Sequence, residues 1–263
     1  MHIRKGKLIM KNTKHLSIGI LGVGSIGKTL ARKLAQAGHH VKVANSRGPE
    51  TIEADTLEFG ARAVEAAEAV KDVDVVILSI PFGRILDVAP LVAGLPAETV
   101  IIDTGNYYPF RDTTIEPIEA GQVESVWVAE QLGRPIAKAW NSIVADSFAR
   151  KGTTKGTPNR VALPVAADRE TDGQVAMALV EDTGFDGFDA GALADSWRQQ
   201  PGSPSYCTDL TAQELPSALA SAEAARLPKR RDLAIEAIQE RAGDSTTNLD
   251  ADYLVRLTRA LFM

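Results

Sequence analysis

An apolar run that leads straight into a glycine motif constrains the fold of this chain more than any other feature. Residues 16–21 read LSIGIL, which is typical of a short buried strand. Gly22, Gly24 and Gly27 follow in the pattern GxGxxG. In such a turn the first glycine permits the tight bend, the second lets the backbone approach a pyrophosphate, and the third lets helix and strand pack closely.

The residues after the turn supply the context that the motif requires. Residues 25–37 read SIGKTLARKLAQA, with apolar side chains at every fourth position and Gly38 as a C-terminal stop, so they predict a helix. Residues 41–44 predict a second strand. A glycine turn between a strand and a helix indicates dinucleotide binding. We expect the free N–H groups at the helix start, around Ser25 and Ile26, to hold the phosphates.

The end of the second strand indicates which dinucleotide binds. Sites for NAD usually carry Asp or Glu there, which accepts a hydrogen bond from the ribose 2′-hydroxyl. Here the residues are Asn45, Ser46 and Arg47, and no carboxylate occurs before Glu50. A guanidinium and a hydroxyl suit a 2′-phosphate instead. We therefore expect NADP as the cofactor, with the alternative that Arg47 is a solvated turn residue.

Further apolar runs predict the rest of a parallel sheet. Residues 73–80 and 100–103 read VDVVILSI and VIID, as in strands buried on both faces, and a shorter strand is expected at 61–64 before a helix at 65–70. Ligands of such sheets lie beyond the carboxyl ends of the strands. The residues that follow these strands, Ser79, Ile80, Pro81 and Gly105, should therefore face the cofactor. Phe82 is either core or a wall for the nicotinamide.

The second half of the chain continues the alternation and then becomes helical. Further elements are expected at residues 124–133, 136–140, 160–166, 171–182 and 187–190, and helical segments at 213–226, 229–241 and 251–262. The expected fold is α/β: a doubly wound, mostly parallel Rossmann-type sheet with a C-terminal helical extension. We expect a basic disordered leader at 1–15, an NADP-binding domain at 16–191, and a helical region at 192–263. That region should pack on the sheet domain or on a second subunit and close one side of the cleft.

Charge is distributed unevenly along the chain. The net charge is -5, which is too mild for a nucleic-acid binder, yet the first 49 residues carry ten Lys or Arg and no acid. The rest of the chain contains the other 19 basic residues and all 34 acidic ones. Five of the early cations lie in the leader. Of the other five, Lys28, Arg32, Lys33, Lys42 and Arg47, we expect most to be solvated and only Arg47 to meet a phosphate.

Several classes of site are excluded by composition. Cys207 is the only cysteine and all four histidines lie within the first 40 residues, so disulfides, Cys or His metal sites and a histidine-based triad are not expected. We predict no metal and no catalytic role for Cys207. No apolar run of 18 residues occurs, so we predict a soluble, cytoplasmic protein without a membrane partner.

The residues that most NADP enzymes use for proton transfer are also missing. The fourth residue after each tyrosine is Arg111, Asp112, Leu210 or Leu257, so no Tyr-x-x-x-Lys pair exists. No late histidine is present to protonate a carbonyl. If the second substrate is instead a hydride carrier with a conjugated ring, the protein mainly has to hold the two rings face to face.

Five segments together resemble a known family. They are IGILGVGSIGKTLARKLAQAGHHVKVANSR at 18–47, VVILSIPF at 75–82, VIIDTGNYYPFRD at 100–112, KAWNSI at 138–143 and DAGALADS at 189–196. Over about residues 16–200 the chain resembles the NADPH-dependent reductases of the deazaflavin coenzyme F420. The resemblance implies that Ser46 and Arg47 hold the 2′-phosphate, that Ile80 and Pro81 lie along the cofactor, and that Ala139 to Ser142 line the nicotinamide side. The basic leader and the longer C-terminal helical region depart from short members.

These observations lead to one list of cofactor residues and three hypotheses. The predicted cofactor-binding residues are Gly22, Gly24, Ser25, Ile26, Gly27, Asn45, Ser46, Arg47, Ser79, Ile80, Pro81, Gly105 and Ala139. The first hypothesis is an NADP(H)-dependent oxidoreductase that exchanges hydride with coenzyme F420 or a flavin. In it Asn106 and Asn141 orient the rings, and Trp140 is a stacking surface or core.

The other two hypotheses assign the pocket differently. One is a reductase of a small imine or carbonyl, for which Asp195, Tyr108 or Tyr206 would have to serve as the acid. The other is a non-catalytic NADP-binding module, in which Tyr107, Trp197 and the C-terminal helices contact a protein partner. In the enzymatic cases we expect a small-molecule redox substrate and a homodimer.

Overall fold

The structure is a computed structural model that describes residues 15–243 and 250–263. Apart from His15, the predicted leader lies outside the described residues. His15 is exposed, and its Nδ1 lies 2.8 Å from the carbonyl oxygen of Gly38, just after the first helix.

An eight-stranded sheet forms the centre of the molecule, in the order β3-β2-β1-β4-β5-β6-β7-β8. The strands are β1 Ser17–Leu21, β2 His40–Ala44, β3 Arg62–Ala63, β4 Val75–Leu78, β5 Val100–Asp103, β6 Ala137–Lys138, β7 Ala162–Ala167 and β8 Asp186–Asp189. All neighbours pair in parallel except β6 and β7. The order reverses between β1 and β4, and this switch point is where ligands bind in doubly wound sheets. The predicted fold class is confirmed.

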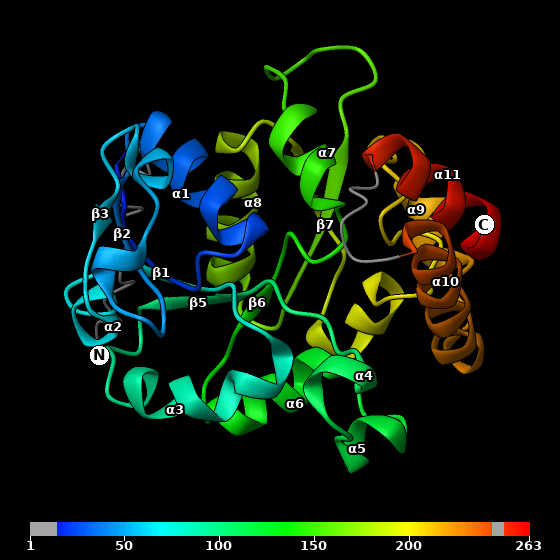
Figure 1. Cartoon of the computed structure of the whole chain (residues 1–263), viewed down its shortest axis with the longest axis horizontal. Coiled ribbons are helices and arrows are strands. Elements are labelled where there is room, and N and C mark those ends of the chain that lie inside the picture. The colour runs from blue at the N-terminus through cyan, green and yellow to red at the C-terminus, as the bar shows by residue number, and fades with distance from the viewer. Residues whose placement is uncertain (1–14, 244–249) are drawn as a thin grey trace, which may run out of the picture.

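Helices cover both faces of the sheet (Figure 1). The helices of the described residues are α1 Ser25–Gln36, α2 Ala66–Ala69, α3 Ile85–Ala93, α4 Pro109–Asp112, α5 Glu116–Glu119, α6 Glu124–Leu132, α7 Ala145–Arg150, α8 Glu170–Asp182, α9 Leu215–Ala220, α10 Leu227–Ala242 and α11 Ala251–Phe262, of which α10 and α11 lie to one side of the sheet. Alternate residues of β4 show the layering: Val75 and Ile77 pack with α1, α7 and α8, while Val76 and Leu78 pack with α2, α3 and α6. The continuous apolar runs in the sequence reflect this burial on both faces.

The predicted elements match the structure closely at the glycine motif and less well later. Residues 25–36 are helical and Gly38 follows with φ 97°, as a glycine stop requires. Helix α3 was not predicted, because Pro90 lies inside it and proline is atypical of a helix interior. Strand β6 is only two residues long, although residues 136–140 were expected to be extended.

The C-terminal region packs against the sheet within the same chain. Thr211 forms a bridge with Val161, beside β7, and Cys207 N–H donates to the carbonyl oxygen of Ser142 at 2.8 Å. Helix α11 lies against α7 and α10 (Figure 1). Residues 207 and 211 therefore contact segments next to the sheet, and α11 contacts α7. The division of the chain into domains at residue 191 stays a prediction.

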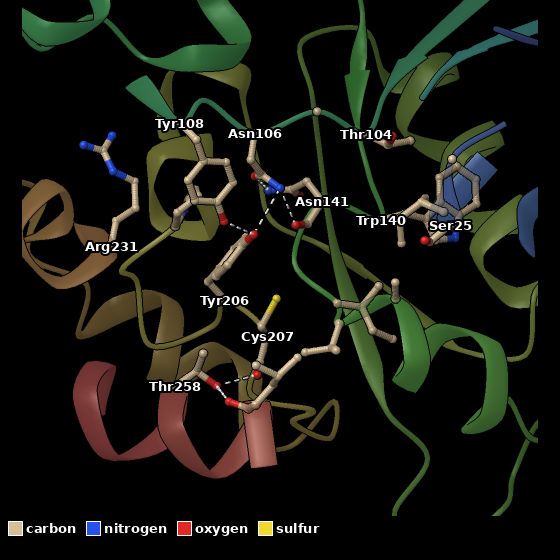
Figure 2. A pocket seen from close by; sticks show the side chains of 18 of the residues that line it. Ser25, Thr104, Asn106, Tyr108, Trp140, Asn141, Tyr206, Cys207, Arg231 and Thr258 are labelled. Atoms are coloured by element: carbon tan, nitrogen blue, oxygen red, sulfur yellow. Dashed lines mark hydrogen bonds between the residues drawn. The ribbon is translucent and has the colours of Figure 1, made fainter. Parts of the chain in front are cut away.

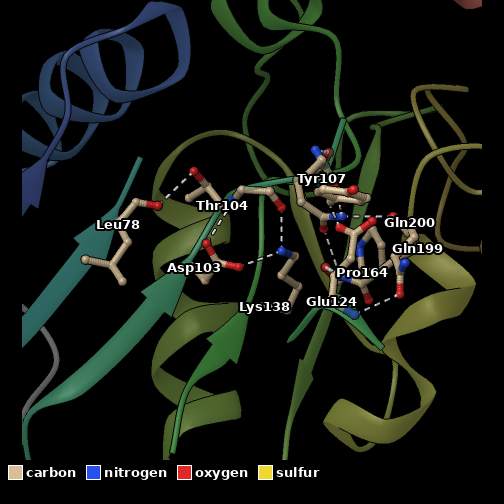
Figure 3. A network of polar contacts seen from close by, with 12 residues as sticks. Leu78, Asp103, Thr104, Tyr107, Glu124, Lys138, Pro164, Gln199 and Gln200 are labelled. Atoms are coloured by element: carbon tan, nitrogen blue, oxygen red, sulfur yellow. Dashed lines mark hydrogen bonds and ion pairs between the residues drawn. The ribbon is translucent and has the colours of Figure 1, made fainter. Parts of the chain in front are cut away.

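A buried ion pair joins β5 to β6 at the carboxyl end of the sheet (Figure 3). Lys138 Nζ lies 2.6 Å from Asp103 Oδ2, and both side chains are almost completely buried. Lys138 also donates to the carbonyl oxygen of Gly105, and Asp103 Oδ1 accepts from Gly105 N–H at 2.9 Å. The pair therefore holds both polar groups of Gly105, the residue where the chain leaves β5.

Lys138→Met should destabilise the protein by about 3–5 kcal/mol, because Asp103 would remain buried without its cation. Urea unfolding followed by circular dichroism measures this loss. Adding Asp103→Asn to Lys138→Met should restore part of the stability, since the amide is neutral and still accepts from Gly105. A loss below about 1 kcal/mol in the single variant, the size of a surface pair, would contradict this account.

Candidate functional site

Two cavities meet at the glycine turn and form one continuous groove. The first encloses about 440 Å³ and the second about 510 Å³. Both are lined by Gly24, Ser79, Ile80 and Pro81, at the carboxyl ends of β1 and β4. The groove therefore crosses the switch point of the sheet, where the sequence predicted the cofactor.

The three glycines of the motif meet different steric constraints. Gly22 has φ 100°, a conformation that favours glycine, and a Cβ at Gly27 would lie 2.0 Å from the carbonyl oxygen of Gly22. A Cβ at Gly24 would meet no protein atom within 4 Å, because it would enter the groove. The first intrahelical bond of α1 runs from Lys28 N–H to Gly24, so the N–H groups of residues 25–27 precede it without a side-chain cap. This cradle fits a pyrophosphate.

The second cavity is bounded by the turn after β2. Asn45, Ser46 and Arg47 all line it. Asn45 Oδ1 accepts from Arg47 N–H at 2.9 Å, and its Nδ2 donates to Thr51 Oγ1 at 2.8 Å. Asn45 therefore shapes the turn, while the exposed Ser46 and Arg47 side chains remain available at the rim.

Three of the five early cations form ion pairs with nearby acids, and the side chains of Lys28 and Arg32 stay partly exposed to solvent. Lys28 lies 2.6 Å from Glu53 and 2.7 Å from Asp55, Arg32 lies 2.6 Å from Glu58, and Lys42 lies 2.8 Å from Glu68. Lys33 lies near the rings of two phenylalanines, and burial lowers the pKa of its amine. Across residues 15–243 and 250–263, Arg47 makes no ion pair.

Two residues of the opposite wall were missed by the sequence reasoning. Arg84 and Asp87 line the second cavity from the start of α3, and their side chains form an exposed ion pair. They lie far from Arg47 in the sequence; Asp87 belongs to α3, which was not predicted, and Arg84 directly precedes that helix. A carboxylate is therefore present at this end of the groove, but a guanidinium already holds it.

The first cavity is where a nicotinamide would lie, and most predicted residues line it. Ser25, Ile26, Ser79, Ile80, Pro81 and Gly105 do so. Ala139 does not: it is completely buried in the core, and its N–H donates to the carbonyl oxygen of Asp103 at 3.2 Å. The resemblance placed Ala139 beside the nicotinamide, but in the structure Trp140, Asn141 and Ile143 line the cavity there instead.

Two aromatic residues with open assignments are core. Phe82 is fully buried and stacks on Trp127 with ring centroids 5.3 Å apart. Trp140 is 1% exposed, and its Nε1 donates to Thr183 Oγ1 at 3.2 Å. The backbone of Trp140 has φ 55°, which is strained for a bulky residue and lets this core side chain border the cavity.

Asn106 and Asn141 bind each other across the first cavity's wall (Figure 2). Asn106 Nδ2 donates to the carbonyl oxygen of Asn141 at 2.8 Å, and Asn141 Nδ2 donates to Asn106 Oδ1 at 3.1 Å. Asn141 also exchanges bonds with Gln199 at 2.8 and 2.9 Å. Both amides are thus engaged with protein atoms. Their role as orienting groups stays a prediction, and the contacts favour an action on neighbouring side chains over direct contact with a substrate.

Two tyrosines of the first cavity share a hydrogen bond. The hydroxyl oxygens of Tyr108 and Tyr206 lie 2.8 Å apart, and Asn106 Nδ2 donates to Tyr206 Oη at 3.3 Å. Burial raises the pKa of both phenols well above their usual value, so both stay protonated. Asp195, the third candidate acid, is exposed on another part of the surface and lines neither cavity.

The C-terminal helices supply the far wall of the first cavity. Five apolar side chains of α10 and α11 line it, namely Ala234, Ile235, Ile238, Leu254 and Phe262. The expectation that this region closes one side of the cleft agrees with this lining. Tyr107 is completely buried, so it is not available to contact a protein partner as the third hypothesis required, whereas Trp197 is partly exposed.

A buried carboxyl lies behind the loop that carries Asn106 and Tyr108. Glu124 is 2% exposed, and its Oε2 accepts from Tyr107 N–H at 3.1 Å (Figure 3). Burial raises the pKa of this carboxyl to about 7, although the positive charge of Lys138 offsets part of the effect. Cys207 is also buried at the cavity, and burial raises the pKa of its thiol far above neutrality. A thiol that stays protonated is a poor nucleophile.

Comparison with known families confirms the resemblance for the first part of the chain. Residues 17–107 match the family described as NADP oxidoreductase coenzyme F420-dependent. This segment contains the glycine turn, Arg47, Arg84 and Asn106, and it implies a nicotinamide dinucleotide as cofactor in an oxidoreductase. The segments at 138–143 and 189–196, and the wall formed by α10 and α11, lie outside the match.

Individual relatives extend this picture. Protein YjhV of Escherichia coli (strain K12) is 46% identical over 78 residues, which cover 28% of this chain and 57% of that protein. The match thus spans little more than half the length of that relative. A hypothetical protein from Sinorhizobium meliloti superimposes with a TM-score of 0.62 at 29% identity, over 74% of this chain and 95% of that one.

A third relative shares the fold alone. A protein from Arthrobacter sp. FB24, named as a candidate F420-dependent NADP reductase, superimposes with a TM-score of 0.53 at 17% identity. The superposition covers 69% of this chain and 87% of that one. Among residues 15–243 and 250–263 no helix has the length and apolarity to span a membrane, and no cluster of His, Cys, Asp or Glu is arranged to hold a metal ion.

Gly24→Ala and Gly27→Ala should have different effects: the first should weaken NADPH binding, and the second should lower the stability of the protein. The added methyl at position 24 meets only the groove, so stability should stay within about 1 kcal/mol of the parent while binding of NADPH falls below detection. The methyl at position 27 collides with the backbone of Gly22, so that variant should lose several kcal/mol or fail to fold. Thermal unfolding and fluorescence titration with NADPH measure the two effects. Equal binding by Gly24→Ala and the parent would exclude a phosphate at this turn.

Glu124 should make the protein less stable as the pH rises from about 4.5 to about 7. Folding raises the pKa of Glu124, so in this pH window the folded protein keeps a proton that the unfolded chain has lost. The free energy of unfolding should therefore fall by up to about 3 kcal/mol between the two pH values. Glu124→Gln should remove this slope, because the amide is neutral and still accepts from Tyr107. Urea unfolding at a series of pH values tests this, with the exposed Glu116→Gln as the matched control. An unchanged slope in Glu124→Gln would contradict the assignment.

Proposed function

We propose that this chain is an NADP(H)-dependent oxidoreductase that exchanges hydride between NADPH and a deazaflavin such as coenzyme F420, or a flavin-type carrier. The observation that carries the proposal is Arg47, which lies beside Ser46 at the rim of the groove, at the end of β2, and makes no ion pair within the described residues 15–243 and 250–263. A bound NADPH would supply the hydride. The glycine turn would hold its pyrophosphate, and the first cavity would take its nicotinamide.

The choice of NADP over NAD rests on charge at the adenosine end. An NAD site needs a carboxylate at the end of β2 for the ribose 2′-hydroxyl, and Asn45 stands there with both amide groups bonded to the turn. Asp87 on the opposite wall is held by Arg84. With Arg47 and Arg84 facing one cavity, a 2′-phosphate would meet two guanidinium groups, which bind phosphate well in fork geometry.

The identity of the hydride acceptor rests on the family match. The description of the matched family names coenzyme F420, and the Arthrobacter relative is named as a candidate F420-dependent NADP reductase. The apolar wall of α10 and α11 suits a planar conjugated ring stacked on the nicotinamide, because such a wall excludes water from the reacting atoms.

A second candidate is reduction of a small imine or carbonyl compound. The hydrogen-bonded hydroxyls of Tyr108 and Tyr206 favour it, because such a substrate requires a proton donor inside the cavity. The cavity of about 440 Å³ has room for a nicotinamide together with a small apolar substrate.

Arg47→Ala should weaken binding of NADPH by about 1–3 kcal/mol and leave binding of NADH nearly unchanged, because only NADPH carries the 2′-phosphate. Titration of the protein with each cofactor at fixed ionic strength measures the difference. Arg62→Ala, which removes an exposed cation of β3 outside the groove, is the matched control and should change neither affinity. An equal loss for both cofactors in Arg47→Ala would show that this residue only shapes the turn.

A substrate panel tests the proposed acceptor. NADPH is mixed with the protein and with oxidised coenzyme F420, FMN, FAD or 1-pyrroline, and the absorbance of the reduced nicotinamide is followed. Turnover with F420 or a flavin supports the first function, and turnover with 1-pyrroline alone supports the second. Tight binding of NADPH without turnover of any acceptor would overturn both.

A further inference from the structure

The geometry points to Tyr206 as the proton donor of the site. We propose that its hydroxyl gives a proton to the nitrogen or oxygen conjugated to the carbon that receives hydride, while the apolar slot between α10 and α11 holds the body of the acceptor. This inference rests on the proposed NADPH-dependent hydride transfer and names the chemical class of the acceptor: a C=N or C=O compound with an apolar face.

The contacts of Tyr206 leave its own proton free for a substrate. The Asn106 amide is fixed in orientation, because its Oδ1 accepts from Asn141 and its Nδ2 donates to the carbonyl oxygen of Asn141. That Nδ2 therefore presents a hydrogen to Tyr206 Oη at 3.3 Å. When Tyr108 donates the hydrogen between the two phenols, Tyr206 accepts twice and can donate only into the cavity. Asn106 and Tyr108 are thus positioning residues for Tyr206.

Other hydroxyls and acids of the first cavity are already engaged. Thr104 Oγ1 donates to the carbonyl oxygen of Leu78 at 3.1 Å, and Thr258 Oγ1 donates to that of Cys207 at 2.6 Å. The serines of the lining, Ser25 and Ser79, lie at the glycine turn, beside the expected pyrophosphate. Arg231, a buried cation that lines the cavity, lies 2.7 Å from Asp232. Lys138, also buried, is enclosed by Asp103 and Gly105 and does not line the cavity.

The proton and the electrons balance through these groups. Hydride brings two electrons and one hydrogen to the acceptor carbon, the π bond becomes a lone pair on the conjugated nitrogen or oxygen, and that atom takes the proton of Tyr206. Tyr206 then recovers a proton from Tyr108 across 2.8 Å, and Tyr108 recovers one from water. The partly exposed Arg111 guanidinium lies 5.2 Å above the Tyr108 ring and stabilises negative charge during this exchange.

The slot determines how the acceptor lies. Most of the side chains that line it from α10 and α11 are apolar: Ala234, Ile235, Ile238, Leu254 and Phe262. The polar ones from these helices are already engaged, since Arg231 pairs with Asp232 at 2.7 Å and Thr258 bonds to the carbonyl oxygen of Cys207. The polar lining includes the Asn106, Tyr108 and Tyr206 cluster (Figure 2). An acceptor with an apolar face toward α10 and α11 therefore turns its C=N or C=O group toward Tyr206.

Tyr206→Phe tests the proposal with 1-pyrroline and with oxidised coenzyme F420 as probes. The variant should lose 10²–10⁴-fold in kcat, the usual size of general acid catalysis, while its Kd for NADPH stays within about twofold of the parent. The solvent deuterium isotope effect on kcat should also fall to near unity. Tyr108→Phe, which leaves the donor in place, should lose roughly tenfold, and Tyr253→Phe on α11, outside the cavity lining, should match the parent.

The outcomes separate this inference from the function on which it rests. Full activity of Tyr206→Phe on a probe that the parent reduces would overturn Tyr206 as donor and leave NADPH-dependent reduction standing. Silence of the parent on both probes and on the flavins, despite tight NADPH binding, would overturn the function and this inference with it. Loss of NADPH binding in Tyr206→Phe together with its activity would assign the residue to the fold of the pocket and refute the proposal.

Discussion

The buried pair of Lys138 and Asp103 is the interaction on which the rest of the site depends. Two charges removed from water are retained only when each is fully bonded, and here both also hold Gly105. The pair lies where the parallel part of the sheet ends, since β6 pairs in parallel with β5 and antiparallel with β7. It thereby fixes the start of the loop that carries Asn106 and Tyr108 and the strand that leads to Asn141. The polar wall of the cavity is anchored to the sheet through these two side chains.

The structure shows which of the early positive charges are neutralised by nearby acids, which the sequence alone does not. The sequence shows ten cations and no acid in the first 49 residues, which could describe any basic surface. In the structure, acids of residues 53–68 fold back and neutralise Lys28, Arg32 and Lys42, so the basic character of this unit is largely cancelled. Arg47 is left at the rim of the groove. A guanidinium that lines the cavity and has no acidic partner among the described residues is a stronger argument for NADP than the composition of the segment.

Local patterns predicted the sheet and the cofactor side, and tertiary contacts decided the rest. Strands buried on both faces appear as continuous apolar runs, and the glycine turn has its own spacing, so both are readable without a structure. Helix α3 was missed because Pro90 contradicts a helical pattern, and with it Arg84 and Asp87 were missed. The resemblance could not show that Ala139, directly after β6, is completely buried while the next residues, Trp140 and Asn141, line the cavity. The Tyr206 contact joins residues 98 positions apart, which no local pattern encodes.

The two sides of the pocket come from different parts of the chain, and the family match covers only one of them. The match therefore says more about the cofactor than about the acceptor. The matched segment ends at residue 107 and supplies the groove for the cofactor. Tyr206 and the slot between α10 and α11, which would select and protonate the acceptor, come from residues after it. Since hydride leaves the cofactor in the same way for many acceptors, a shared cofactor half constrains the acceptor weakly. The position of the proton donor constrains the acceptor further: a stacked carrier, an imine or a carbonyl must each place the nitrogen or oxygen that gains the proton within reach of Tyr206.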